Sequence, residues 1–134
     1  MRAGDCWIIK FEHSGPKAHL WFLLVDPQPD GLAVIASVTT LRHNADRTVI
    51  LQPGEHPFVR HPSFVLYSDC QIINVPDLQK WIETGLAVPN DPFQPEVINE
   101  IQRGALLSDF TARKIELFVK ACLDQKLKAA SNRK

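Results

Sequence analysis

The sequence predicts an α+β fold in which a small, strongly curved β-barrel or half-open sheet of about five strands precedes two to three helices. The first half contains apolar runs rich in β-branched and aromatic residues, separated by Gly and Pro. The second half instead repeats apolar residues at helical spacing. The 134 residues suit one domain. We therefore expect a single domain, 1–134, with a strand-rich part at about 4–75 and a helical part at about 77–127 packed on it.

Five segments of the first half are typical of strands because they are apolar and are bounded by turn residues. They are residues 6–11, 19–26, 32–40, 47–52 and 63–73. The intervening segment "PGEHPFVRHP", residues 53–62, contains prolines at both ends and in its middle. Proline cannot donate a ladder hydrogen bond, so this segment is expected to form a loop.

The first predicted helix lies in "PDLQKWIETG", residues 76–85. Leu78, Trp81 and Ile82 follow i, i+3, i+4 spacing and would share one face. Asp77 is the expected N-cap, and Gly85 is expected to follow the end of the helix.

Two more helices are predicted in the C-terminal third of the chain. The second starts at Pro95, which suits a first helical turn, and is expected to end at Gly104. The third follows Ser108 or Thr111. Its apolar face would contain Ile115, Phe118, Val119, Cys122 and Leu123.

Composition excludes several classes of protein. Lys+Arg and Asp+Glu balance at 15 each, so any attraction to nucleic acid must come from a local basic site. The three cysteines show no CxxC or His-paired spacing, which favours buried thiols in a reducing compartment and no metal or other cofactor. The longest apolar run, residues 20–25, is too short to cross a membrane. We expect a cytoplasmic, soluble protein without a membrane partner.

Three phrases in the strand-rich part carry a family resemblance. They are "GDCWIIKF" at residues 4–11, "VIASVTT" at 34–40 and "SFVLYSDCQI" at 63–72. They resemble three strands of the PemK/MazF (Kid-like) toxins of bacterial toxin–antitoxin pairs, over roughly residues 4–75. The resemblance implies an SH3-like barrel, an endoribonuclease activity, a cognate antitoxin partner, RNA as the target and a homodimer.

The chain departs from the family pattern at two functional places. Ala18 and His19 stand where the family has an Arg-Pro pair before its second strand. Ile73 and Pro76 stand where the family has an arginine and an acidic residue after its Asp-Gln pair. Because a fold does not carry an activity by itself, two other functions stay open. One is a non-catalytic SH3-like protein–protein interaction module, and the other is an antidote or regulatory partner.

The candidate catalytic residues are His19, Arg60 and His61. Metal-independent RNA cleavage needs a base for the 2′-hydroxyl, an acid for the departing 5′-oxygen and a cation for the phosphorane charge. Histidine suits the first two roles near neutral pH, and arginine can hold a phosphate with two hydrogen bonds. The structural alternative is that the loop histidines hydrogen-bond the backbone and that Arg60 is solvated.

Five further residues are candidate substrate contacts: Thr39, Thr40, His56, Ser63 and Tyr67. The hydroxyl groups at the end of the third strand could contact phosphate, and the tyrosine ring could stack on a base. Each has an ordinary alternative, since threonine favours strands and a tyrosine can bury its ring with its hydroxyl at the edge.

Overall fold

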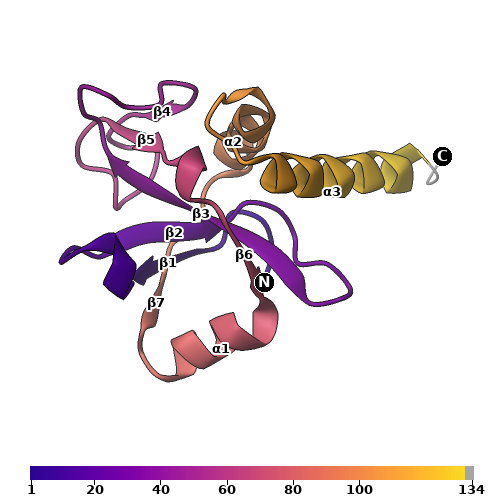
Figure 1. The fold of residues 1–134 in the computed structure, drawn as a ribbon, viewed down its shortest axis with the longest axis horizontal. Helices are drawn as coiled ribbons and strands as arrows, with labels where there is room; N and C mark the ends of the chain where they lie inside the picture. The colour runs from indigo at the N-terminus through magenta and orange to yellow at the C-terminus, as the bar shows by residue number, and fades with distance from the viewer. Residues whose placement is uncertain (132–134) are drawn as a thin grey trace.

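The computed structural model describes residues 1–131, and there it contains a seven-stranded antiparallel sheet and three α-helices (Figure 1). The strands are β1 (Cys6–Ile9), β2 (His19–Leu23), β3 (Leu32–Thr40), β4 (Ile50–Leu51), β5 (Ser63–Val65), β6 (Gln71–Asn74) and β7 (Ala87–Asn90). The helices are α1 (Val75–Glu83), α2 (Pro95–Leu107) and α3 (Arg113–Ser131), with short 3-10 helices η1 (Glu12–Ser14) and η2 (Tyr67–Asp69). The predicted α+β class is confirmed.

The strands lie in the order β4-β5-β3-β2-β1-β7, and β6 also pairs with β3. The long strand β3 pairs with β6 through residues 32–35 and with β5 through residues 38–40. Strands β4 and β7 are the two edges, and no ladder joins them in the described chain. The sheet is therefore not closed into a barrel. Of the two predicted alternatives, the barrel is wrong and the open sheet remains.

A loop, rather than a strand ladder, spans the two sides of the open sheet. Between β4 and β5, the His56 ring lies 4.9 Å from the Phe93 ring, measured between centroids. Its Nε2 also hydrogen-bonds the carbonyl oxygen of Asp91, just after β7, at 2.6 Å. This hydrogen bond joins a side chain to a backbone carbonyl 35 positions away, and it connects the loop after β4 with the end of β7.

The strands differ from the prediction most clearly in three places, while β1 and β2 are only shorter than predicted. Residues 63–73 form two strands, β5 and β6, separated by the 3-10 turn η2. Strand β4 keeps only two residues of the predicted 47–52 segment. Strand β7 is not among the five predicted strands. Its Pro89 is tolerated because β7 is an edge that pairs only with β1.

Successive residues of a strand point to opposite faces of the sheet. Here both alternating sets contain apolar side chains, so both faces of the sheet are apolar. In β2, Leu20 and Phe22 belong to an inner cluster, while Trp21 and Leu23 belong to an outer cluster. Helices α2 and α3 lie on one side of the sheet and α1 lies on the other (Figure 1). The chain thus has two apolar clusters that share one sheet.

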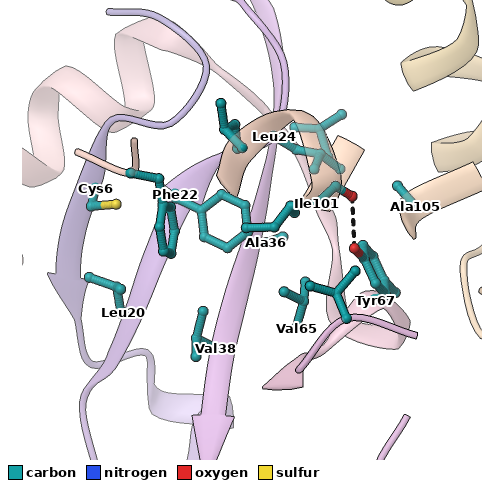
Figure 2. Packing of buried hydrophobic residues seen from close by; sticks show 14 of the residues in the cluster. Cys6, Leu20, Phe22, Leu24, Ala36, Val38, Val65, Tyr67, Ile101 and Ala105 are labelled. Carbon is teal, nitrogen blue, oxygen red and sulfur yellow. Dashed lines mark hydrogen bonds between the residues drawn. The ribbon is translucent and has the colours of Figure 1, made fainter. Parts of the chain in front are cut away.

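The inner cluster is covered by α2 and α3. Helix α2 buries Ile101 and Ala105 in it (Figure 2), and α3 buries Val119. Two polar contacts attach α2 to the sheet side. The Tyr67 hydroxyl donates to the carbonyl oxygen of Ile101 at 2.7 Å, and Gln102 Nε2 donates to that of Leu24 at 3.0 Å. Buried polar groups are paired in this way because an unpaired one is costly.

Helix α2 does not end at Gly104 as predicted but continues to Leu107. A side chain at position 104 would overlap the Tyr67 hydroxyl and the Cγ2 atom of Val49. The glycine therefore serves close packing between α2 and the sheet rather than helix termination.

The outer cluster is covered by α1, which buries Leu78 and packs Trp81 and Ile82 against the strands. The N-cap is Asn74 and not Asp77, since the Asn74 side chain accepts a hydrogen bond from the backbone N–H of Asp77 at 2.9 Å. Gly85 follows the helix with a φ of +81°, as its predicted position requires. Within residues 1–131, no helix is long and apolar enough to span a membrane.

Candidate functional site

A cleft of about 710 Å³ lies between the loop 53–62 and the adjoining ends of β2, β3 and β7. We call it the main cleft. Its walls include all three candidate catalytic residues, His19, Arg60 and His61. The fold therefore brings the start of β2 and a loop more than 30 positions later in the chain to one cavity.

The main cleft is lined by basic side chains. Lys17 joins His19, Arg60 and His61 on its walls, and within residues 1–131 no Asp or Glu lines it. The whole chain has equal numbers of basic and acidic residues, so this positive character is local. Such a site attracts an anion such as a phosphate group.

The loop 53–62 has two buried anchors and displays the residues around them. His56 and Val59 are only 2% and 4% exposed, whereas Phe58, Arg60 and His61 are exposed. The backbone N–H of Phe58 donates to His56 Nδ1 at 3.0 Å, and the N–H of Val59 donates to the His56 carbonyl at 3.0 Å. The anchors fix the backbone that carries the exposed groups, which lowers the entropy cost of binding.

Three hydroxyl residues proposed as substrate contacts also line the main cleft. Thr39 is partly buried and Thr40 is exposed at the end of β3, where Thr40 pairs with Ser63 of β5. The Ser63 hydroxyl already donates to the carbonyl oxygen of His61 at 2.8 Å. Ser63 therefore fixes the backbone of His61 next to the cleft.

His56 and Tyr67, the other two proposed contacts, do not line the main cleft. His56 accepts from the Phe58 N–H through Nδ1, so Nε2 carries the proton and donates to Asp91. Tyr67 is buried in the inner cluster and its hydroxyl donates to Ile101. Packing and hydrogen bonding within the protein occupy both side chains, so the structure does not bring these two predicted contacts to the main cleft.

Three polar or aromatic residues of the main cleft were not among the candidates predicted from the sequence: Lys17, Phe58 and Asn90. Lys17 lies two residues before His19, and Phe58 lies in the same loop as Arg60 and His61. Their closeness in sequence to the candidate residues could have identified both. Asn90 ends β7, a strand that was not predicted. The exposed Phe58 ring adds an aromatic surface to the basic cleft.

The cysteines offer no reactive nucleophile. Burial raises the pKa of the Cys6 and Cys70 thiols to about 12, so both stay protonated at neutral pH. The pKa of the Cys122 thiol is also raised, again first by burial. In the described chain, no group of three His, Cys, Asp or Glu side chains could hold a metal ion.

Comparison with known proteins assigns no family to the chain. No protein-family model matches it, and no curated protein or solved structure is significantly similar to it. Function is therefore inferred from the geometry and chemistry of the main cleft.

Proposed function

We propose that the protein is a PemK/MazF-like toxin that binds and cleaves single-stranded RNA in the main cleft. The observation that carries this proposal is that Lys17, His19, Arg60 and His61 line one cavity. The exposed ring of Phe58 lies on the same walls. Cationic side chains beside an aromatic ring form the usual chemistry of single-strand binding, where phosphates meet charge and bases stack.

The cleft supplies the groups that RNA cleavage requires. Arg60 and Lys17 hold the phosphate and stabilise the charge that develops on it. One of the two histidines, His19 or His61, removes the proton from the 2′-hydroxyl. The 2′-oxygen attacks phosphorus, a 2′,3′-cyclic phosphate forms, and the bond to the 5′-oxygen breaks. The other histidine gives a proton to that 5′-oxygen.

The proposal includes an SH3-like architecture in which the loop 53–62 takes the place of barrel closure. It also includes a cytoplasmic location and a cognate antitoxin, with a homodimer as the assembled form. Leu107 and Phe110, at the α2–α3 turn, are 75% and 60% exposed, and their large apolar side chains support a protein partner.

Induced expression in a bacterium, followed by mapping of RNA ends in arrested cells, tests the proposal. We expect growth arrest and new RNA ends with the native chain and neither with Arg60→Gln. The matched control is Arg47→Gln, which removes the same charge from an exposed residue outside the cleft and should leave toxicity intact. Unimpaired growth with intact RNA would remove the toxin function. Purified protein that binds RNA in the cleft without cutting it would instead indicate a non-catalytic module.

A further inference from the structure

A second cavity, of about 240 Å³, adjoins the main cleft on the outer face of the sheet. Its strand walls are His19 and Trp21 of β2 and Ser37 and Thr39 of β3, and no residue of α1 lines it. His19 and Thr39 also line the main cleft, so the two cavities share a boundary. We call this second cavity the Trp21 pocket.

The indole of Trp21 has an unused hydrogen-bond donor. Trp21 is 1% exposed, and its buried Nε1–H has no hydrogen-bond partner among the described residues. An indole N–H can only donate, so it requires an acceptor. A buried donor without one is costly and calls for an explanation. Trp21 lines the pocket, so an acceptor on a ligand that displaces the atoms covering Nε1 would supply it.

Other side chains around the Trp21 pocket supply the kinds of group that a planar heterocycle can contact. Arg42 contributes donors and is held with its guanidinium carbon 5.3 Å from the centroid of the Phe64 ring. Asp69 contributes an acceptor, and one of its oxygens already accepts from Gln71 Nε2 at 3.2 Å. Leu66 adds an apolar wall. The cavity thus combines donors, an acceptor and apolar surface.

We propose that the Trp21 pocket receives one base of the RNA whose phosphate lies in the main cleft. This inference rests on the proposed function. The cavity is smaller than the roughly 300–1,000 Å³ of pockets that bury a drug-sized ligand, and it suits a base rather than a whole nucleotide. The Trp21 indole N–H donates to a carbonyl oxygen or ring nitrogen of the base. The shared residues His19 and Thr39 lie between the base and the phosphate.

The first test follows the indole N–H signals by nuclear magnetic resonance in the full-length protein. The chain has three tryptophans, and Trp7→Phe and Trp21→Phe assign two of the three signals. The probes are the four ribonucleoside 5′-monophosphates, with ribose 5-phosphate as the base-free control. We expect at least one nucleotide to shift the Trp21 signal, while ribose 5-phosphate leaves it in place. A Trp21 signal that none of the four nucleotides moves overturns the proposal.

The second test compares binding by two matched variants. Trp7 lies directly opposite Trp21 in the β1–β2 register and belongs to the same cluster, but it lines neither cavity. Trp21→Phe should weaken binding of the preferred nucleotide roughly three- to tenfold, as expected for one neutral hydrogen bond. Trp7→Phe should leave it unchanged. Equal losses in the two variants would show a packing effect and contradict a base contact.

An exposed pair of variants keeps the proposal testable if Trp21→Phe fails to fold. Arg42→Gln removes a group of the Trp21 pocket, and Arg47→Gln removes the same charge nearby without lining either cavity. Only the first should reduce the difference in affinity between the preferred nucleotide and the other three. Unchanged preference in Arg42→Gln, with the Trp21 signal also unmoved, contradicts the proposal.

These readouts separate the failure of the inference from the failure of the proposed function, because nucleotide binding is measured without cleavage. If the protein cuts no RNA but a nucleotide shifts the Trp21 signal, the nuclease function fails and the base pocket stands. If the protein cuts RNA but the Trp21 signal and the base preference of Trp21→Phe are unaffected, the nuclease function stands and the base pocket fails.

Discussion

The two faces of the sheet differ in how far their helices cover them. On the inner face, α2 and α3 seal an apolar cluster that includes residues of β1, β2, β3 and β5. On the outer face, α1 packs against Leu23 and Ile35, but the same rows of β2 and β3 continue into His19, Ser37 and Thr39. On the outer face, the polar side chains therefore lie beyond the part of the sheet that α1 covers.

Because of this difference, the inner face of the sheet mainly stabilises the fold, and one end of its outer face carries the candidate functional residues. Inner-face residues contribute mainly buried apolar area. The uncovered end of the outer face borders both cavities, through His19 and Thr39. We expect substitutions on the inner face to change the free energy of unfolding, and substitutions at the uncovered end to change ligand binding and cleavage.

Removal of α2 and α3, the helices that cover the inner face, should have the largest effect on stability. Deletion of residues 94–134 removes α2 and α3 and exposes Phe22, Ala36 and Val65 of the inner cluster. The amphipathic helices and the strands need each other's apolar surface, so the product should aggregate or lack a cooperative melting transition. Calorimetry checks this outcome. A truncated chain that melts as cooperatively as the full chain would refute it.

Gly104→Ala should have the next largest effect on stability. Alanine normally favours a helix by about 1 kcal/mol over glycine. Here the added methyl group meets the Tyr67 hydroxyl and Val49, so we expect destabilisation of about 2 to 3 kcal/mol. Denaturant unfolding measures the difference.

The same overlap predicts a partial rescue. Adding Tyr67→Phe to Gly104→Ala removes the hydroxyl that the new methyl group would meet. The double variant should therefore lose less stability than the sum of the two single losses. Additive losses, or a stabilising Gly104→Ala, would show that close packing at this position is not the reason for the glycine.

Asp46→Ala should also destabilise the fold, by about 1.5 to 3 kcal/mol at neutral pH, the range for a hydrogen bond to a charged group. Asp46 attaches the end of α2 to the loop before β4, because its Oδ2 accepts from the Ser108 hydroxyl at 2.6 Å. Its Oδ1 accepts from the backbone N–H of Thr48 at 3.0 Å. Thermal melting compares the variant with the native chain.

The contribution of Asp46 should depend on pH. Burial alone raises the pKa of this carboxyl, but the hydrogen bonds from Ser108 and Thr48 outweigh it, and the pKa is lowered overall. A lowered pKa in the folded state stabilises the fold above the unfolded value, near pH 4, and this gain is lost as pH falls through the folded pKa. The stability gap between the native chain and Asp46→Ala should shrink below about pH 4. A constant gap would contradict the assignment.

Local patterns predicted the helices well but not the closure of the sheet. The stripe of Leu78, Trp81 and Ile82 is a local signal and gave the face of α1 that is buried. The contact between His56 and Asp91, which spans the open sheet, depends on residues 35 positions apart. Strand β7 escaped prediction because an edge strand tolerates a proline that a central strand would not.

The candidate site was partly predictable for the same reason. A loop rich in proline and polar residues identified Arg60 and His61, and the structure places both on the main cleft with His19. Residue type does not reveal burial, however. His56 has the same imidazole group as the exposed His61, but it is buried and hydrogen-bonded within the protein. Tyr67 is buried and hydrogen-bonded in the same way.

The two histidines of the loop 53–62 provide the most direct test of the account. His56 is a buried anchor and His61 is displayed in the main cleft, so loss of His56 should lower stability and loss of His61 should lower cleavage.

The measurement is RNA cleavage per folded molecule, with melting of the same samples, for His56→Ala and His61→Ala. We predict that His61→Ala cuts RNA about 10²- to 10⁴-fold more slowly with its melting temperature unchanged, as expected for a lost acid or base. His56→Ala should melt at a lower temperature and cut RNA in proportion to its folded fraction. If His61→Ala cleaves RNA at the native rate, or loses as much stability as His56→Ala, the account is contradicted.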